Sequence, residues 1–83
     1  MAISLSFCPG VVPRLDDLQA LALEQGYEIA GGTLQIQSHK SQEEWRFVAI
    51  SLNQKVGVSL PVLSDTLRQW EGVQSYTLAH ARN

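Results

Sequence analysis

Cysteine, charge and long apolar runs are all scarce in this chain of 83 residues. The single cysteine, Cys8, cannot form a disulfide within the chain, and no second cysteine accompanies it to complete a structural zinc site. This cysteine usage favours a reducing compartment. No apolar run approaches the ~20 residues of a membrane-spanning helix, and the N-terminus lacks the pattern of a signal peptide. We therefore expect a soluble segment, excised from a larger protein because Met1-Ala2 leads directly into a strand pattern.

The low charge also limits the classes of partner. Charged residues make up 17% of the chain, against a usual ~25%. The net charge is −2, and the six basic residues are scattered along the sequence instead of forming a patch. Nucleic acid and anionic lipid surfaces normally require a basic patch, so the composition argues against both as partners.

The apolar residues follow strand and helix periods in a definite order. Ile3, Leu5 and Phe7 alternate with polar or small residues, whereas Leu15, Leu18 and Leu21 recur at helical spacing. The predicted elements of this single domain, 1–83, are strand 3–7, helix 13–25, strand 27–37, strand 45–52, a loop at 53–58, a helix capped by Ser59 with Pro61 in its first turn, and strand 73–81.

Each helix pattern ends at a glycine that leads into a strand, at Gly26 and again at Gly72. The order strand, helix, strand, strand, helix, strand predicts an α+β fold, the ferredoxin-like βαββαβ sandwich. Its four-stranded antiparallel sheet carries both helices on one face. Gly31-Gly32 predicts a bulge or bend in the second strand. Strand 45–52 is apolar on both faces, which predicts a central position in the sheet.

The sheet face without helices is the surface that we expect to make contacts. Strand alternation predicts that this open face displays Ser4, Ser6, Cys8, Gln35, Phe47, Gln74 and Tyr76. Phe47 and Tyr76 are therefore interpreted as contacts of a homodimer, and their replacement by alanine should weaken self-association while the monomer stays folded. RNA-recognition modules stack bases on such a face, but the first strand here offers no aromatic residue.

No combination of side chains in the sequence has the spacing of a catalytic or metal site. Cys8 has no base nearby in the pattern, because His39 falls on the hairpin tip and His80 near the C-terminus. The acidic pairs at 16–17 and 43–44 are adjacent, and adjacent side chains point to different faces. A copper-transport module on this fold would need two cysteines. We therefore predict no enzyme activity, no metal and no cofactor.

Three stretches together resemble an ACT-type regulatory domain over almost the entire chain. They are Cys8-Pro9-Gly10 after the first strand, the run 24–29 from Glu24 to Ile29, and the run 67–76 from Leu67 to Tyr76. In ACT domains the loop after the first strand contributes to an amino-acid site across a dimer. The resemblance implies that Cys8, Pro9, Gly10 and Val11 lie beside a small-molecule ligand.

A closer likeness is to the cytosolic C-terminal domain of MgtC/SapB-type bacterial membrane proteins, which itself resembles ACT domains in fold. It is carried by a glutamate-rich hairpin before Phe47-Val48-Ala49-Ile50 and by the closing helix, Gly-Val and strand. This likeness implies a regulatory or interaction domain on the cytosolic face of the inner membrane. The partner would be a protein or the rest of the parent chain, in a family linked to magnesium limitation and virulence. The alternative is an amino-acid-sensing ACT domain of a metabolic enzyme or regulator.

Overall fold

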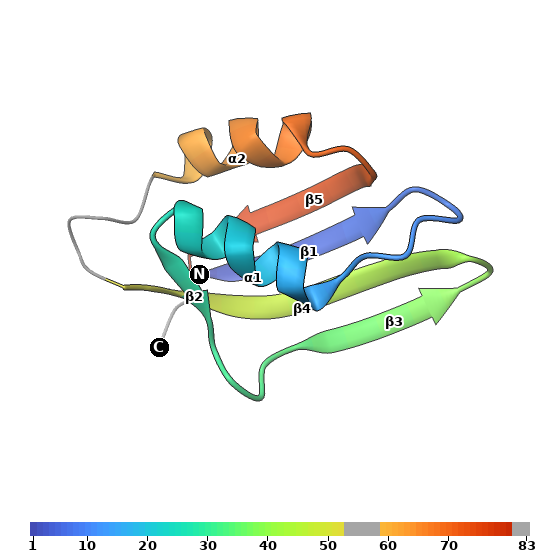
Figure 1. The fold of residues 1–83 in the computed structure, drawn as a ribbon, viewed down its shortest axis with the longest axis horizontal. Coiled ribbons are helices and arrows are strands. Elements are labelled where there is room, and N and C mark those ends of the chain that lie inside the picture. Colours follow the sequence, from blue (N-terminus) through green and yellow to red (C-terminus); the bar gives the residue numbers. More distant parts are fainter. Residues whose placement is uncertain (53–58, 81–83) are drawn as a thin grey trace.

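The computed structural model describes residues 1–52 and 59–80, which form an antiparallel sheet and two helices (Figure 1). The predicted loop at 53–58 and the end of the last predicted strand, from residue 81, lie outside the described residues. The elements are β1 (Ala2–Phe7), α1 (Leu15–Glu24), β2 (Tyr27–Ile29), β3 (Gln35–His39), β4 (Gln42–Ser51), α2 (Leu60–Gln69) and β5 (Val73–Ala79).

The sheet has five strands in the described residues, so the prediction of four strands is wrong in its count. The predicted strand 27–37 is divided into β2 and β3, which both pair with β4. Ile29 pairs with Ala49 and Gln35 with Arg46, so the chain advances six residues from β2 to β3 while β4 advances only three. The predicted interruption at Gly31-Gly32 is confirmed, and it is large enough to separate two strands.

The hydroxyl of Thr33 fills the gap in hydrogen bonding that this interruption creates. It accepts a hydrogen bond from the Val48 backbone N–H at 3.1 Å and donates one to the Ala30 carbonyl oxygen at 2.7 Å. A backbone N–H without a partner is costly where water has little access. Thr33 therefore takes the place of a main-chain partner between β2 and β3, and β4 remains one uninterrupted strand.

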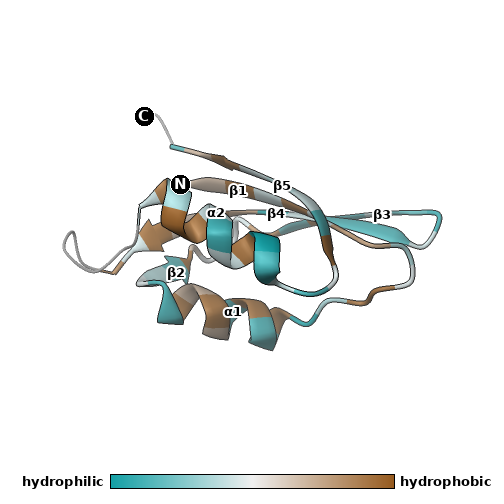
Figure 2. Ribbon diagram, turned by 90° about the horizontal axis from the view of Figure 1, so that it is seen from above, coloured by the Kyte–Doolittle hydropathy of each residue, from teal (hydrophilic) through white to brown (hydrophobic). Residues whose placement is uncertain are grey.

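The strand order is β2-β4-β1-β5, with β3 also paired to β4, and every ladder is antiparallel. The central position predicted for β4 is confirmed. Both helices lie on the same side of the sheet (Figure 2), and their buried leucines share one core with the inward residues of the central strands. The buried core residues are Ile3, Leu5, Phe7, Leu18, Trp45, Phe47, Ala49, Leu63 and Leu67.

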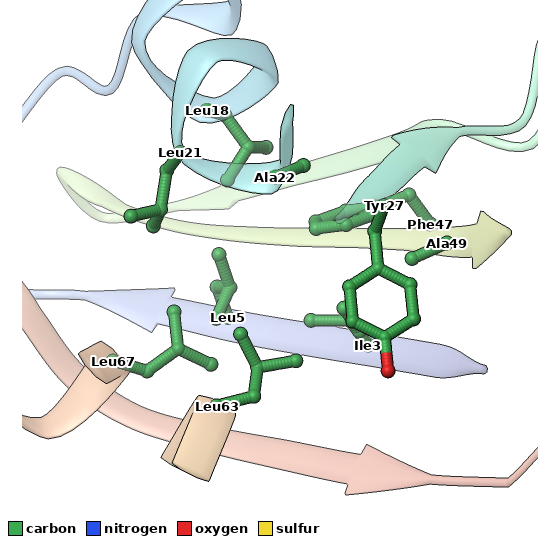
Figure 3. A pocket seen from close by; sticks show the side chains of 10 residues that line it. All are labelled: Ile3, Leu5, Leu18, Leu21, Ala22, Tyr27, Phe47, Ala49, Leu63 and Leu67. Atoms are coloured by element: carbon green, nitrogen blue, oxygen red, sulfur yellow. The ribbon is translucent and has the colours of Figure 1, made fainter. Parts of the chain in front are cut away.

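Leu5, with no exposed surface, stands at the centre of this core. In Figure 3, side chains of α1, α2, β1 and β4 converge around a residual cavity of ≈ 20 Å³. A cavity of that size is close to the minimum for one water molecule, and its lining is apolar, so it has no partners for water. It is therefore a packing gap between the helices and the sheet.

Phe7 connects the sheet to the end of α2. Its ring makes edge-to-face contacts with Trp45 and Trp70, each with centroids 6.2 Å apart. Such pairs contribute about 0.5–1.5 kcal/mol beyond their buried area. Just after Trp70 the chain turns at Gly72, whose φ of 96° is one that glycine adopts without strain. The predicted glycine stop is confirmed here, and it is confirmed at Gly26, where φ is 84°.

Candidate functional site

The loop that resembles an ACT ligand site, Cys8 to Val11, is held by main-chain hydrogen bonds within the chain. The Cys8 N–H donates to the Gly72 carbonyl at 2.8 Å, and the Gly10 N–H donates to the Ser41 carbonyl at 3.0 Å. The Val11 N–H closes a turn onto the Cys8 carbonyl at 3.0 Å. Three donors that could hold a ligand carboxylate are therefore engaged, and the loop is attached to both the α2–β5 turn and the β3–β4 hairpin.

A hollow of ≈ 270 Å³ lies between this loop and the hairpin tip. It is lined by Gly10 and Val11 on one side and by Ser38, Ser41 and Glu43 on the other. The Glu43 carboxylate accepts a hydrogen bond from the Trp45 indole N–H at 3.0 Å, which fixes its orientation. The hollow thus places the predicted loop residues beside one carboxylate and two hydroxyls. Pro9 is exposed on the same loop.

The adjacent glutamates of the hairpin diverge, as the sequence predicts. Glu43 bonds to Trp45 on the helix side, whereas Glu44 pairs with the Arg46 guanidinium at 3.0 Å on the other side. No group of three histidine, cysteine, aspartate or glutamate side chains in residues 1–52 and 59–80 is placed to hold a metal ion.

Phe47 and Tyr76 do not lie on the open face, so that part of the prediction is wrong. Phe47 is 4% exposed and belongs to the core, because its register partner on β1 is the buried Ile3. Tyr76 is half-buried opposite Leu5, and its hydroxyl bonds to the side chain and the carbonyl of Ser64 on α2, at 2.6 and 3.0 Å. Phe47 is therefore a core residue, and Tyr76 links β5 to α2 through its hydrogen bonds to Ser64.

The open face is instead made of the residues that alternate with the core. Residues that lie directly opposite one another on neighbouring strands point to the same face of a sheet. Ser4 lies opposite Thr77 and Arg46, and Ser6 lies opposite Ser75 and Glu44, so these residues all lie on the open face. The predictions for Ser4, Ser6 and Gln35 are confirmed. By register, the open face includes Ala2, Ser4, Ser6, Glu28, Gln35, Gln37, His39, Gln42, Glu44, Arg46, Val48, Ile50, Ser75, Thr77 and Ala79.

At one end of the sheet, a register shift between Ser6 and Phe7 breaks the alternation of β5. The side chain of Gln74 beside this shift bonds to Gln42 across the sheet at 2.7 Å. Because of this shift, the alternation of side chains along β5 does not show on which face of the sheet Gln74 lies. The sequence carries no direct signal for this shift, because it arises from the way in which β1 and β5 pair.

The two edges of the sheet differ in protection. One edge is formed by β2 and β3, which are short, interrupted and marked by the exposed Glu28. The other edge is β5, whose seven residues include no charge and no proline. Natural sheets usually protect an edge with charge, proline, a bulge or shortness. Among residues 1–52 and 59–80, the structure thus has one protected edge and one edge, that of β5, to which no further strand is paired.

Nothing in the described residues forms a helix with the length and apolarity needed to cross a membrane. No protein-family model, no curated protein sequence and no solved structure matches this chain.

Proposed function

We propose that this chain is a non-catalytic interaction domain that forms a homodimer and acts as the regulatory module of a larger protein. The observation that carries the proposal is the open face. Most of its side chains are uncharged, and Glu44 and Arg46 pair with one another at 3.0 Å, whereas Glu28 lies at its β2 end. When another surface covers the paired Glu44 and Arg46, no unpaired charge is removed from water there.

The fold that we propose in detail is the ferredoxin-like, ACT-like sandwich. When β2 and β3 are counted together as one interrupted strand, the element order reads βαββαβ. In the order β5-β1-β4-β2, the first strand of that pattern, β1, lies between its third strand, β4, and its last strand, β5. Both helices cover one side of the sheet, which is the arrangement on which this assignment rests (Figure 2).

The resemblance to the cytosolic domain of MgtC/SapB-type proteins suggests where such a module operates. In that setting the parent protein is anchored in the bacterial inner membrane, and this domain meets a protein partner or the rest of its own chain on the cytosolic side. Its role would be regulatory, in adaptation to magnesium limitation. No cofactor is needed for this function.

Sedimentation equilibrium between 1 µM and 1 mM, as an order-of-magnitude range, tests the central part of this proposal. We expect the apparent mass to rise from one chain to two as concentration increases. A mass of one chain throughout this range would contradict the homodimer.

An amino-acid sensor is the second candidate, favoured by the hollow beside Gly10 and Val11 with its Glu43 carboxylate. A ligand at 100 times its dissociation constant stabilises the folded state by about 2.7 kcal/mol, which is a clear rise in melting temperature. We would measure melting with each of the twenty amino acids and, separately, with magnesium chloride. If none changes the melting temperature, the sensor function is excluded and the interaction domain stands alone.

A further inference from the structure

A largely apolar hollow, the α1–β2 groove, lies between α1 and β2 at the end of the strand order opposite β5. It measures ≈ 360 Å³ and is lined by Gln19, Leu23, Tyr27, Glu28, Ile29 and Leu52. Leu23 is 63% exposed and Leu52 is 49% exposed, whereas Tyr27 and Ile29 are half-buried and pack against the core. Exposed apolar residues that gather around one hollow mark a contact surface, while single exposed ones are common on any protein.

Main-chain hydrogen bonds hold the sides of the groove in place. The chain leaves α1 and turns through the buried Gly26 into β2. The Leu52 N–H donates to the Gly26 carbonyl at 3.0 Å, and the Ala30 N–H donates to the Val48 carbonyl at 2.8 Å. Both ends of β2 are thus bonded to β4. The groove is therefore already formed in the free domain, which lowers the cost of ordering it when a ligand binds.

The segment that forms α1, β2 and most of β3 is strongly acidic. Residues 15–38 contain four of the chain's eight acidic residues and none of its six basic residues or two histidines. The four, all exposed, are Asp16, Asp17, Glu24 and Glu28. In the part of the chain that the structure describes, the ion pairs are Glu44–Arg46 and Asp65–Arg68, so these four carboxylates have no counter-ion there.

Two of these carboxylates flank the α1–β2 groove. Glu24 follows Leu23 at the last position of α1, and Glu28 lies between Tyr27 and Ile29 on β2, toward the open face. The helix dipole favours cations at a C-terminal end, yet α1 has no basic residue in its last turn. Glu24 therefore adds negative charge to a helix end that is already negative. A cation bound there would interact favourably with both.

The charge beside the groove discriminates between possible occupants. Nucleic acid and anionic lipid surfaces are repelled by unpaired carboxylates. A second copy of this chain that presented its own groove would bring Glu24 and Glu28 against the same residues of its partner, which is unfavourable. An apolar side chain that is flanked by lysine or arginine fits both the groove and its charged border.

We propose that the α1–β2 groove binds a segment of another protein in which a large apolar side chain is flanked on both sides by lysine or arginine. The apolar side chain lies between Leu23 and Leu52, and the basic side chains reach Glu24 and Glu28. This inference goes beyond the proposed homodimer, because it concerns a groove beside α1 and holds whether or not two copies associate.

Short synthetic peptides test this inference by NMR titration of the isotope-labelled chain. The probe peptides carry leucine, phenylalanine or tryptophan between pairs of lysines, and a control peptide carries serine between the same lysines. We expect a dissociation constant of about 1 mM or lower for at least one apolar probe. The largest amide shifts should fall at Leu23, Ile29 and Leu52. The serine peptide should bind about fivefold or more weakly, because it has no apolar side chain to bury.

A substitution in the groove tests the apolar contact. Leu23→Ser removes an exposed apolar side chain and should weaken binding of the apolar probe about tenfold. The matched control is Val62→Ser, which makes a similar change at a residue of α2 that is 50% exposed and lies outside the groove. The control should bind the probe as the unchanged chain does. Circular dichroism of each variant would verify that it is folded.

Neutral substitutions test the charged border. Glu24→Gln with Glu28→Gln should weaken binding about fivefold at low ionic strength, and the difference should shrink as salt is added, because salt screens exposed charges. Glu71→Gln removes an exposed carboxylate outside the groove and should change the dissociation constant less than about twofold.

Each contrary outcome is separate from the test of the homodimer. Peptide shifts confined to other surfaces, or binding that Leu23→Ser leaves unchanged, would overturn the groove as the site. Equal binding of the serine peptide would show attraction by charge alone and would also overturn it. So would the absence of shifts with every apolar probe at about 5 mM. Sedimentation of the chain without peptide decides the homodimer independently.

Discussion

Replacement of Thr33 by valine removes one hydroxyl and leaves the shape of the side chain almost unchanged. That hydroxyl is the acceptor for the Val48 N–H at 3.1 Å and a donor to the Ala30 carbonyl at 2.7 Å. The Ala30 carbonyl keeps a hydrogen bond from the Thr33 backbone N–H at 3.3 Å, whereas the Val48 N–H loses the Thr33 hydroxyl as its acceptor. The substitution therefore tests whether Thr33 substitutes for a main-chain partner in the interrupted strand.

The magnitude follows from the cost of leaving a donor unsatisfied, which is about 1–3 kcal/mol in a buried site. Thr33 and Val48 are only half-buried, so water relieves part of this cost. We expect a loss of about 1–2 kcal/mol from a total stability that is roughly 4–12 kcal/mol for a chain of this length. The melting temperature should fall by about 5–15 °C.

Urea unfolding and amide exchange at Val48 measure this effect. Thr33→Ser keeps the hydroxyl and should retain most of the stability. Thr77→Val, at an exposed position on the open face, should stay within about 0.5 kcal/mol of the unchanged chain. The reasoning is refuted if Thr33→Val unfolds at the same urea concentration as the unchanged chain and the Val48 amide remains equally protected.

Three further substitutions test the packing around the site by urea unfolding. Phe47→Ala should cost about 3–5 kcal/mol as a core truncation, and a loss below about 1 kcal/mol would contradict its burial. Tyr76→Phe removes the hydroxyl bonded to Ser64 and should cost about 1 kcal/mol of stability. If Tyr76→Phe costs as much stability in a Ser64→Ala background, the hydroxyls of Tyr76 and Ser64 are not coupled. Gly72→Ala, at a φ of 96°, should cost about 1–3 kcal/mol, whereas Gly31→Ala, with open space around its Cβ, serves as its control.

The sequence determined the elements and much of their placement. Alternation in 3–7 and 45–52 predicts strands, helical spacing of leucines predicts two helices, and Gly26 and Gly72 mark where the helices end. These features are local, since each depends on the period or backbone freedom of neighbouring residues. The apolar character of both faces of β4 was enough to place it centrally.

Only the tertiary structure decided which face each strand turns toward the helices. The predicted strand 45–52 carries apolar residues on both faces, so its alternation alone cannot show that Phe47 is buried; the pairing of Phe47 with Ile3 does. The division of β2 from β3 also depends on where each meets β4 and on the Thr33 hydroxyl between them. Register and pairing are long-range properties, because they join residues far apart in the chain, and the local pattern of a strand leaves them open.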